Sequence, residues 1–224
     1  MAKEYLINKE STKAFMMCNE AIVRGALEAD VKVVSFYPGS PTSEILDTFF
    51  TLRNQFDYKF TTAINEKVAL ETAAGASMSG FRSFTSMKSV GLNVASDAFF
   101  SLAYTGINAG LVMVVADDPS CHSSQSEEDG RFFGPNAYIP MLEPSNPSEA
   151  RRMVKAAFEI SERHKSIVVI RTTTRVNHQS GIVETEPLSR KPFEKAKWSE
   201  VGKDYFTVGE TARQNKYKLL KKVK

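Results

Sequence analysis

Four polar segments of the chain carry residue types that can do chemistry, and each follows an apolar, strand-like run. Their sequences are YPGSPTSE from residue 37, NEK from 65, SMKSVGLN from 86 and DDPSCHSSQSEED from 117. They contain carboxylic acids, lysines, a histidine and hydroxyls, which are side chains that exchange protons or bind anions. In an open sheet of parallel strands, ligands bind outside the carboxyl ends of the strands. The sequence therefore points to one edge of a predicted sheet as the place of a site.

Each segment, taken alone, also has an ordinary structural explanation. The run Pro38–Pro41 is a turn sequence. Glu66, at the start of a predicted helix, is a typical partner for the helix dipole. Cys121 and His122 have no second pair at ligand spacing, so no metal site is expected. No glycine spacing matches a dinucleotide or P-loop fingerprint, so nucleotide binding of those kinds is not predicted either.

Alternating helix and strand patterns position these segments. The strands are continuous apolar or β-branched runs, which is typical of a parallel sheet covered on both faces. We therefore predict an α/β fold, with a parallel sheet flanked by helices on both faces. The predicted strands cover 31–37, 59–64, 81–87, 110–116 and 166–171, and the predicted helices cover 12–29, 41–53, 66–79, 91–104 and 147–164.

Capping residues mark the predicted helix starts. Ser11 and Thr12 can cap the first helix. Ser40 is predicted as the cap of the second helix, with Pro41 at its first helical position. Asn65 is expected to cap the third helix, directly before Glu66.

The rest of the chain departs from this rhythm. Residues 117–134 have no apolar period and are predicted as a long loop, followed by a short helix over 135–141. Asn146 and Pro147 are expected to start the last helix of the domain. Residues 173–224 are predicted as an extended segment that ends in a basic helix.

The composition fits one large α/β domain: the chain has 224 residues, of which 42% are hydrophobic and 25% are charged. The net charge of +3 is unevenly distributed. Residues 1–185 carry 18 Lys and Arg against 21 Asp and Glu, whereas residues 186–224 carry 11 against 5. We predict an α/β domain over 1–185 and a basic extension or linker over 186–224. The acidic body is not expected to bind nucleic acid.

Several classes of protein are not expected. Two cysteines, Cys18 and Cys121, cannot supply a disulfide framework, a four-cysteine zinc site or an iron–sulfur cluster. The longest apolar run, 109–116, is too short to cross a membrane. Charged residues throughout 1–30 argue against a signal peptide. The sequence predicts a cytoplasmic protein without a membrane partner.

Taken together and in this order, the four segments resemble the thiamine-diphosphate-dependent 2-oxoacid:ferredoxin oxidoreductases. Within that family the likeness is greatest to the N-terminal pyrimidine-binding domain of the indolepyruvate ferredoxin oxidoreductase type of α subunit. It covers about 10–215. The motifs that carry it are Tyr37–Ile45, Asn65–Glu71, Ser86–Val94 and Ala116–Glu127.

The resemblance implies a role for Glu66. In this family the glutamate at that position hydrogen-bonds a ring nitrogen of the cofactor's aminopyrimidine. A proton there favours the imino tautomer, whose exocyclic nitrogen can remove the thiazolium C2 proton. Burial raises the pKa of carboxylic acids in general, so that such an acid can hold a proton near neutrality. The resemblance also implies cofactor contacts by Gly39, Ser40, Pro41, Gly91 and Asn93, and substrate contacts by Ser40, Lys88 and His122.

The other half of the family's cofactor site is expected elsewhere. The family holds the cofactor diphosphate through Mg²⁺ with a Gly-Asp-Gly segment, and this sequence contains no such tripeptide. The resemblance implies that the chain, as a split subunit or a fragment, binds only the pyrimidine half of thiamine diphosphate and no metal. It implies a diphosphate-binding domain or subunit, an iron–sulfur subunit and ferredoxin as partners, within a homo- or hetero-oligomer.

The implied reaction is oxidative decarboxylation of an arylpyruvate-like 2-oxoacid to its acyl-CoA, with coenzyme A as second substrate and ferredoxin as electron acceptor. Two alternatives stay open. One is a split thiamine-diphosphate decarboxylase of the sulfopyruvate or phosphonopyruvate type, which needs no iron–sulfur chain. The other is a domain kept for assembly or regulation, without a catalytic role.

Overall fold

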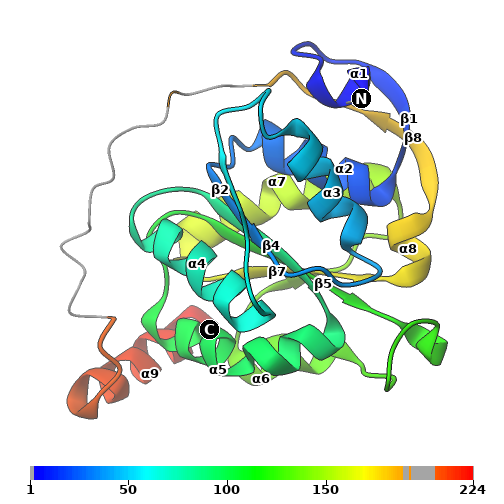
Figure 1. Ribbon diagram of the computed structural model, residues 1–224. Helices are drawn as coiled ribbons and strands as arrows, with labels where there is room; N and C mark the ends of the chain where they lie inside the picture. Colours follow the sequence, from blue (N-terminus) through cyan, green and yellow to red (C-terminus); the bar gives the residue numbers. More distant parts are fainter. Residues whose placement is uncertain (1–2, 189–191, 193–204, 224) are drawn as a thin grey trace.

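The structure of the chain, a computed structural model, describes residues 3–188, 192 and 205–223 (Figure 1). At its centre is a six-stranded sheet in the order β3-β2-β4-β5-β7-β6, in which every neighbouring pair is parallel. This confirms the predicted parallel sheet. The strands are β2 (Val33–Phe36), β3 (Lys59–Thr62), β4 (Ser83–Lys88), β5 (Leu111–Asp117), β6 (Met141–Leu142) and β7 (Val168–Thr173).

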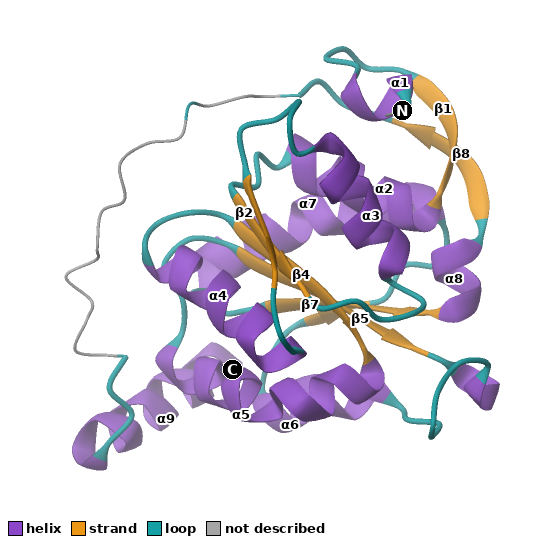
Figure 2. Ribbon diagram, viewed as in Figure 1, coloured by secondary structure: helices purple, strands orange, loops and turns teal. Residues whose placement is uncertain are grey.

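Helices cover both faces of this sheet (Figure 2). The central strand β5 shows why its sequence is apolar throughout. Val112 and Val114 enter the core on one face, whereas Met113 and Val115 enter the core on the other. The first face packs against α2 (Cys18–Glu28), α3 (Ser43–Leu52) and α7 (Pro147–His164), and the second against α4 (Glu66–Met78), α5 (Ser89–Thr105) and α6 (Phe133–Ala137).

The order of the strands changes direction between β2 and β4. From β2 the chain passes through α3 to the edge strand β3, and α4 then brings it back to β4 on the other side of β2. The loop after β2 leads to a helix on one face, and the loop after β4 leads to a helix on the opposite face. In folds of this kind ligands bind at such a switch point, outside the carboxyl ends of the strands. We call this place, the carboxyl edge of the sheet between β2 and β4, the crevice.

The first predicted helix is wrong at its start. Lys13–Met17 forms strand β1, which pairs antiparallel with β8 (Ser180–Glu184), and α2 begins only at Cys18. In this ribbon Met16 is buried and Phe15 is exposed, which is the alternation of a strand with one covered face. The partner strand is far away in the sequence, so the local pattern could not reveal the pairing.

The segments outside the helix–strand rhythm are partly regular. Residues 173–184, predicted as extended, contain α8 (Thr174–His178) and β8. The short helix predicted over 135–141 is α6, which begins earlier and is followed by β6. The remaining elements are α1 (Glu4–Ile7) and two 3-10 turns within the predicted loop, η1 (Pro119–Cys121) and η2 (Gly130–Phe132).

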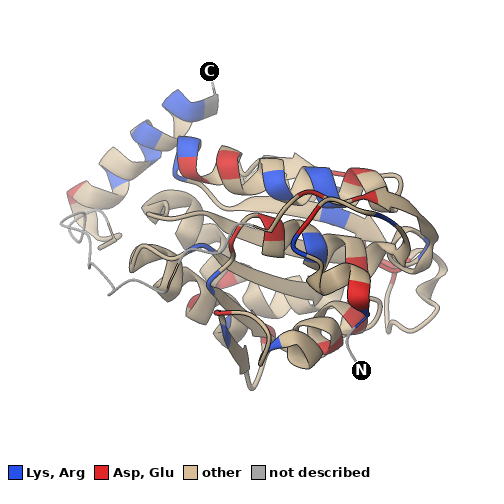
Figure 3. Cartoon of the chain, turned by 90° about the horizontal axis from the view of Figure 1, so that it is seen from above, with Lys and Arg blue, Asp and Glu red and all other residues tan. Residues whose placement is uncertain are grey.

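The predicted basic helix is α9 (Gly209–Val223), which packs on the outside of α5 through Leu219. Figure 3 shows Lys and Arg along this helix, in blue. The predicted division at residue 186 stays a prediction. In the part of the chain that the structure describes, no helix combines the length and the apolar surface needed to cross a membrane.

Candidate active site

The start of α4 places Glu66 at the carboxyl edge of the sheet. Asn65 caps the helix as predicted, because its side-chain oxygen accepts a hydrogen bond from the Val68 amide at 2.9 Å. Glu66 is the first helical residue and is half-buried. Its carboxylate has neither a hydrogen-bond partner nor an ion pair among the described residues, so it is available to a ligand.

Gly91, in the first turn of α5, faces this carboxylate. A Cβ atom on Gly91 would lie 2.6 Å from Oε1 of Glu66 and 2.7 Å from its Cγ, closer than side-chain atoms approach. A glycine is therefore required here if Glu66 is to keep its position. Two residues implied as cofactor contacts, from different helices, thus meet in the structure.

The loop after β2 reaches the start of α5 on the other side of the crevice. Gly39 lies so close to Lys88, the last residue of β4, that a Cβ atom on Gly39 would be 3.6 Å from the Lys88 Cβ. Ser40 is exposed, and its hydroxyl has no partner within the described part of the chain. The loop therefore presents a free hydroxyl beside the crevice.

The predicted start of the second helix is wrong. α3 begins at Ser43, so Ser40 does not cap it and Pro41 is not its first residue. Thr42 precedes the helix, and both its amide and its hydroxyl donate to the carbonyl of Gly39 at 2.9 Å. A turn closed on itself thus separates Ser40 from the helix and leaves its side chain free for another role.

Lys88 is buried, and its ammonium is engaged by the loop that follows β5. Its Nζ donates to the carbonyl and, at 3.2 Å, to the hydroxyl of Ser123, and it lies 3.8 Å from Asp118. Asp118 accepts hydrogen bonds from Ser123, Ser124 and Thr174 at 2.7–2.8 Å. Burial raises the pKa of this carboxyl, but the three hydrogen bonds and the lysine charge outweigh burial and lower it to about 2. Lys88 and Asp118 thus clamp the loop after β5 to the carboxyl end of β4.

The other two residues implied by the resemblance, Asn93 and His122, are both exposed. Asn93 is exposed and donates to both carboxylate oxygens of Glu128 at 2.9 Å, which ties α5 to the same loop. His122 is exposed on that loop. Among the described residues, no hydrogen bond joins Asn93 or His122 to Glu66. Their roles toward cofactor and substrate stay predictions.

A buried pair of amides next to the loop after β2 was not predicted from the sequence. Asn19 in α2 and Asn177 in α8 are both fully buried and hydrogen-bonded to each other at 2.6 Å. Asn19 also donates to the carbonyl of Pro41 at 2.9 Å and to Glu44 at 2.8 Å. The only signal in the sequence is a polar residue at the start of an otherwise apolar helix face.

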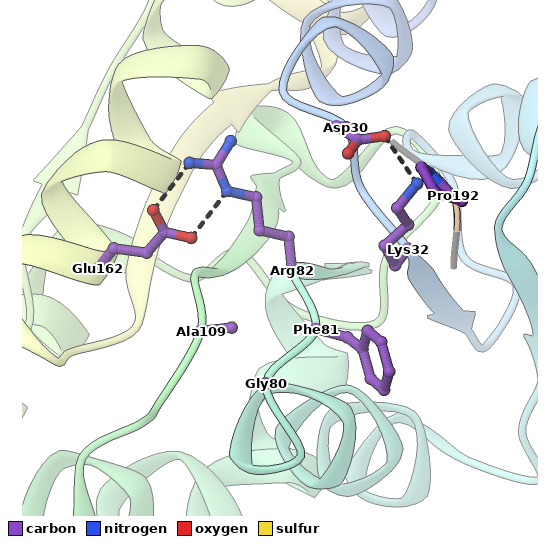
Figure 4. Close-up of a pocket in the computed structure, with 8 residues that line it drawn as sticks. All are labelled: Asp30, Lys32, Gly80, Phe81, Arg82, Ala109, Glu162 and Pro192. Carbon is purple, nitrogen blue, oxygen red and sulfur yellow. Dashed lines mark hydrogen bonds and ion pairs between the residues drawn. The ribbon is translucent and has the colours of Figure 1, made fainter. Parts of the chain in front are cut away.

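A cavity of about 340 Å³ lies at the opposite edge of the sheet (Figure 4). Its lining comes from residues just before β2, β4 and β5, from Glu162 of α7 and from Pro192, away from the carboxyl edge. The charges in it are paired, since Arg82 binds both carboxylate oxygens of Glu162 at 2.7 Å and Lys32 binds Asp30 at 2.8 Å. Anywhere in the described ranges, no three His, Cys, Asp or Glu side chains are grouped to hold a metal ion. The crevice is the better candidate site.

Comparison with known families decides the assignment. The family described as "Pyruvate flavodoxin/ferredoxin oxidoreductase, thiamine diP-bdg" matches residues 24–217. The chain belongs to this family. Membership in the pyruvate flavodoxin/ferredoxin oxidoreductase family confirms the resemblance, and with it the expectation of a thiamine-diphosphate-binding domain.

Relatives within this family narrow the likeness. The chain is 47% identical over 212 residues to the indolepyruvate oxidoreductase subunit IorA of Methanothermobacter marburgensis, covering 95% of this chain and 34% of that subunit. It is 51% identical over 178 residues to IorA of Pyrococcus horikoshii, covering 80% of this chain and 28% of that subunit. A 2-oxoglutarate synthase subunit KorA of Archaeoglobus fulgidus is 26% identical over 176 residues. The chain thus spans about a third of the length of the IorA relatives.

A solved structure agrees on the fold. The 2-oxoglutarate:ferredoxin oxidoreductase from Magnetococcus marinus, which has 2-oxoglutarate, coenzyme A and succinyl-CoA bound, superposes with a TM-score of 0.74. The match covers 94% of this chain and 44% of that chain at 14% sequence identity. At this identity the likeness supports the α/β fold and nothing finer.

Proposed function

We propose that this chain supplies the pyrimidine-binding half of the cofactor site in a 2-oxoacid:ferredoxin oxidoreductase of the indolepyruvate type. The observation that carries the proposal is the unpaired Glu66 carboxylate, held at the start of α4 against Gly91. Family membership and the IorA relatives support the reaction class, oxidative decarboxylation of an arylpyruvate-like 2-oxoacid to its acyl-CoA. They also favour it over a decarboxylase without iron–sulfur clusters.

The residues present fit the pyrimidine half of thiamine diphosphate. When bound, the cofactor supplies the carbon nucleophile that attacks the 2-oxoacid carbonyl. Glu66 would hold a proton at a ring nitrogen of the pyrimidine. A carboxyl group can do so here because no other group of the described chain binds it. Gly91 keeps the first turn of α5 from displacing that carboxyl. Ser40, exposed beside the crevice, would donate a hydrogen bond from its hydroxyl to the 2-oxoacid.

The remaining parts of the enzyme would come from partner domains or chains. The residues around the crevice are unusually apolar for an exposed surface: Ile64 is 83% exposed, Val94 50% and Tyr37 38%. We assign this rim to a diphosphate-binding domain or subunit that carries Mg²⁺. Docking there would exclude water from the half-buried Glu66. An iron–sulfur subunit would pass the electrons to ferredoxin.

The test is Glu66→Gln in the assembled enzyme. An amide can still hydrogen-bond at the helix start but cannot hold and release a proton. We expect exchange of the C2 proton of bound thiamine diphosphate for deuterium to slow by roughly 10²–10⁴. Glu71→Gln is the matched control, because Glu71 lies on the same helix but is exposed. Its ion pair is with Lys67, at 3.9 Å. Equally fast exchange in Glu66→Gln and wild type would refute the assignment and favour a non-catalytic domain.

A further inference from the structure

We propose that Asn19, held in place by Asn177, is a positioning residue that fixes the loop 37–42 and with it the Ser40 hydroxyl. The inference rests on the proposed function only for the role of Ser40. It assigns a task to two fully buried amides of α2 and α8, one of which binds the loop after β2.

The hydrogen bonds of Asn19 determine how its amide is oriented. Its nitrogen donates to the Pro41 carbonyl at 2.9 Å and to Glu44 at 2.8 Å, so both N–H groups are used. Its oxygen accepts from the Asn177 nitrogen at 2.6 Å. A flipped amide would bring its oxygen against two acceptors, so only this orientation is compatible with the surroundings.

Asn177 has little to do apart from orienting Asn19. Its side-chain oxygen is buried and has no partner among the described residues, which costs free energy on folding. Replacing a buried polar pair by apolar groups of similar shape is often neutral for stability. The pair is therefore better explained by the geometry it imposes on the loop than by the stability it contributes.

The loop held in this way is the one that presents Ser40. Asn19 binds the carbonyl of Pro41, the residue next to Ser40, while the carbonyl of Gly39 on the other side of Ser40 accepts the two bonds from Thr42 that close the turn. Ser40 thus lies in a closed turn that is held from α2. The helix that carries Asn177 also begins with Thr174, which donates to Asp118 at 2.8 Å. The two loops that border the crevice are therefore held by one short helix.

Hydrogen exchange on the full chain tests the positioning directly. With Asn19→Ala we expect the backbone amides of residues 37–45 to exchange about tenfold faster, with those of 111–117 unchanged. Asn177→Ala should produce the same pattern more weakly, because Asn19 keeps its own donors. The matched control is Asn146→Ala, which removes the cap of α7 and lowers stability without contact to this loop. Unchanged exchange in 37–45 for both Asn19→Ala and Asn177→Ala would overturn the inference.

A double-mutant cycle in the assembled enzyme adds the link to Ser40. We expect Asn19→Ala to raise the KM for the 2-oxoacid roughly 10- to 100-fold, with a much smaller effect on kcat. Ser40→Ala should act in the same way, and the double variant should be no worse than Ser40→Ala alone. Additive losses would overturn the inference. An unchanged KM in Ser40→Ala would instead overturn the substrate role of Ser40, and exchange in 37–45 would still decide whether Asn19 positions the loop.

Discussion

Gly91 controls how closely the start of α5 approaches the Glu66 carboxylate. A Cβ atom at this position would lie 2.6 Å from Oε1, so an alanine would force Glu66 to move. Elsewhere in a helix the same change is favourable, since alanine is about 1 kcal/mol better than glycine. The added methyl group of Gly91→Ala should therefore disturb the position of Glu66 without destabilising the helix.

We expect Gly91→Ala in the assembled enzyme to slow C2 proton–deuteron exchange by about tenfold or more, because small displacements of a catalytic group are costly. Gly75→Ala is the matched control. Gly75 lies in α4, and a Cβ atom there would meet no atom within 4 Å, so the variant should keep the wild-type exchange rate. Thermal melts would confirm that both variants fold. If Gly91→Ala exchanged as fast as Gly75→Ala, the position of Glu66 would not limit the chemistry.

At the scale of elements, buried runs and helix caps could be predicted from the sequence. The strand predicted over 110–116 is β5 (Leu111–Asp117), because every residue of it is buried and the run ends at charged residues. Asn65 and Asn146 cap α4 and α7 as expected, through bonds to the third residue of each helix. These signals lie within a few residues of the feature they specify.

Features that depend on distant partners could not be predicted. β1 looked like the start of α2 because its partner β8 is contributed by the other end of the domain. Ser40 and Pro41 have the residue types of a helix start, yet a turn closed by Thr42 and held by Asn19 places them before α3. The sequence motifs marked Glu66 and Gly91, but not that they touch. The contact of Lys88 with the loop after β5 could not be predicted from the sequence either.

The loop after β5, which Asp118 holds in place, should loosen in acid. The pKa of Asp118 is lowered to about 2 in the folded chain, whereas an unperturbed aspartate has a pKa of about 3.9. A carboxyl whose folded-state pKa is lowered stabilises the fold above its unfolded pKa, and this stabilisation is lost as the pH falls through the folded value. We expect the free energy of unfolding attributable to Asp118 to be complete at pH 5 and to decline between about pH 4 and pH 2.

Urea unfolding at a series of pH values measures this contribution. Asp118→Asn cannot accept bonds from Ser123, Ser124 and Thr174 in the same way, so it should be less stable than wild type at pH 5. The difference between the two proteins should shrink as the pH approaches 2. A difference that is constant with pH would mean that the Asp118 charge does not hold the loop.

At the scale of the whole molecule, a buried ionic network joins the two ends of the domain. Glu28 in α2 is fully buried and pairs with Arg24 at 3.0 Å and with Arg151 of α7. It also accepts a hydrogen bond from the Glu186 amide at 2.8 Å, just after β8. Arg24 in turn donates to the carbonyls of Leu6 and Glu186. The first residues and the chain leaving β8 are therefore held to the same two helices.

Removing the charge of Glu28 should be severe, because it leaves the buried Arg24 guanidinium without an anion and leaves Arg151 with Glu186 alone. We expect Glu28→Gln to lower the free energy of unfolding by about 3–5 kcal/mol. Glu159→Gln, at an exposed position of α7, makes the same chemical change and should alter it by less than about 0.5 kcal/mol. Similar denaturation midpoints for the two variants would contradict a central role for the network.

The last prediction concerns what the chain can bind by itself. The crevice offers a carboxyl and a hydroxyl to the pyrimidine side of thiamine diphosphate, while the sequence has no Gly-Asp-Gly segment for the Mg²⁺-bound diphosphate. Hydrogen bonds to charged groups such as the diphosphate are stronger than those to neutral groups. The chain alone therefore lacks the larger part of the affinity for the cofactor. Calorimetry with thiamine diphosphate and Mg²⁺ should give a Kd weaker than micromolar for the isolated chain. Adding the diphosphate-binding partner should create tight binding, which Tyr37→Asp or Ile64→Asp, at the exposed apolar rim, should weaken. Micromolar binding by the chain alone would place the diphosphate site within it, and the rim would then need another explanation.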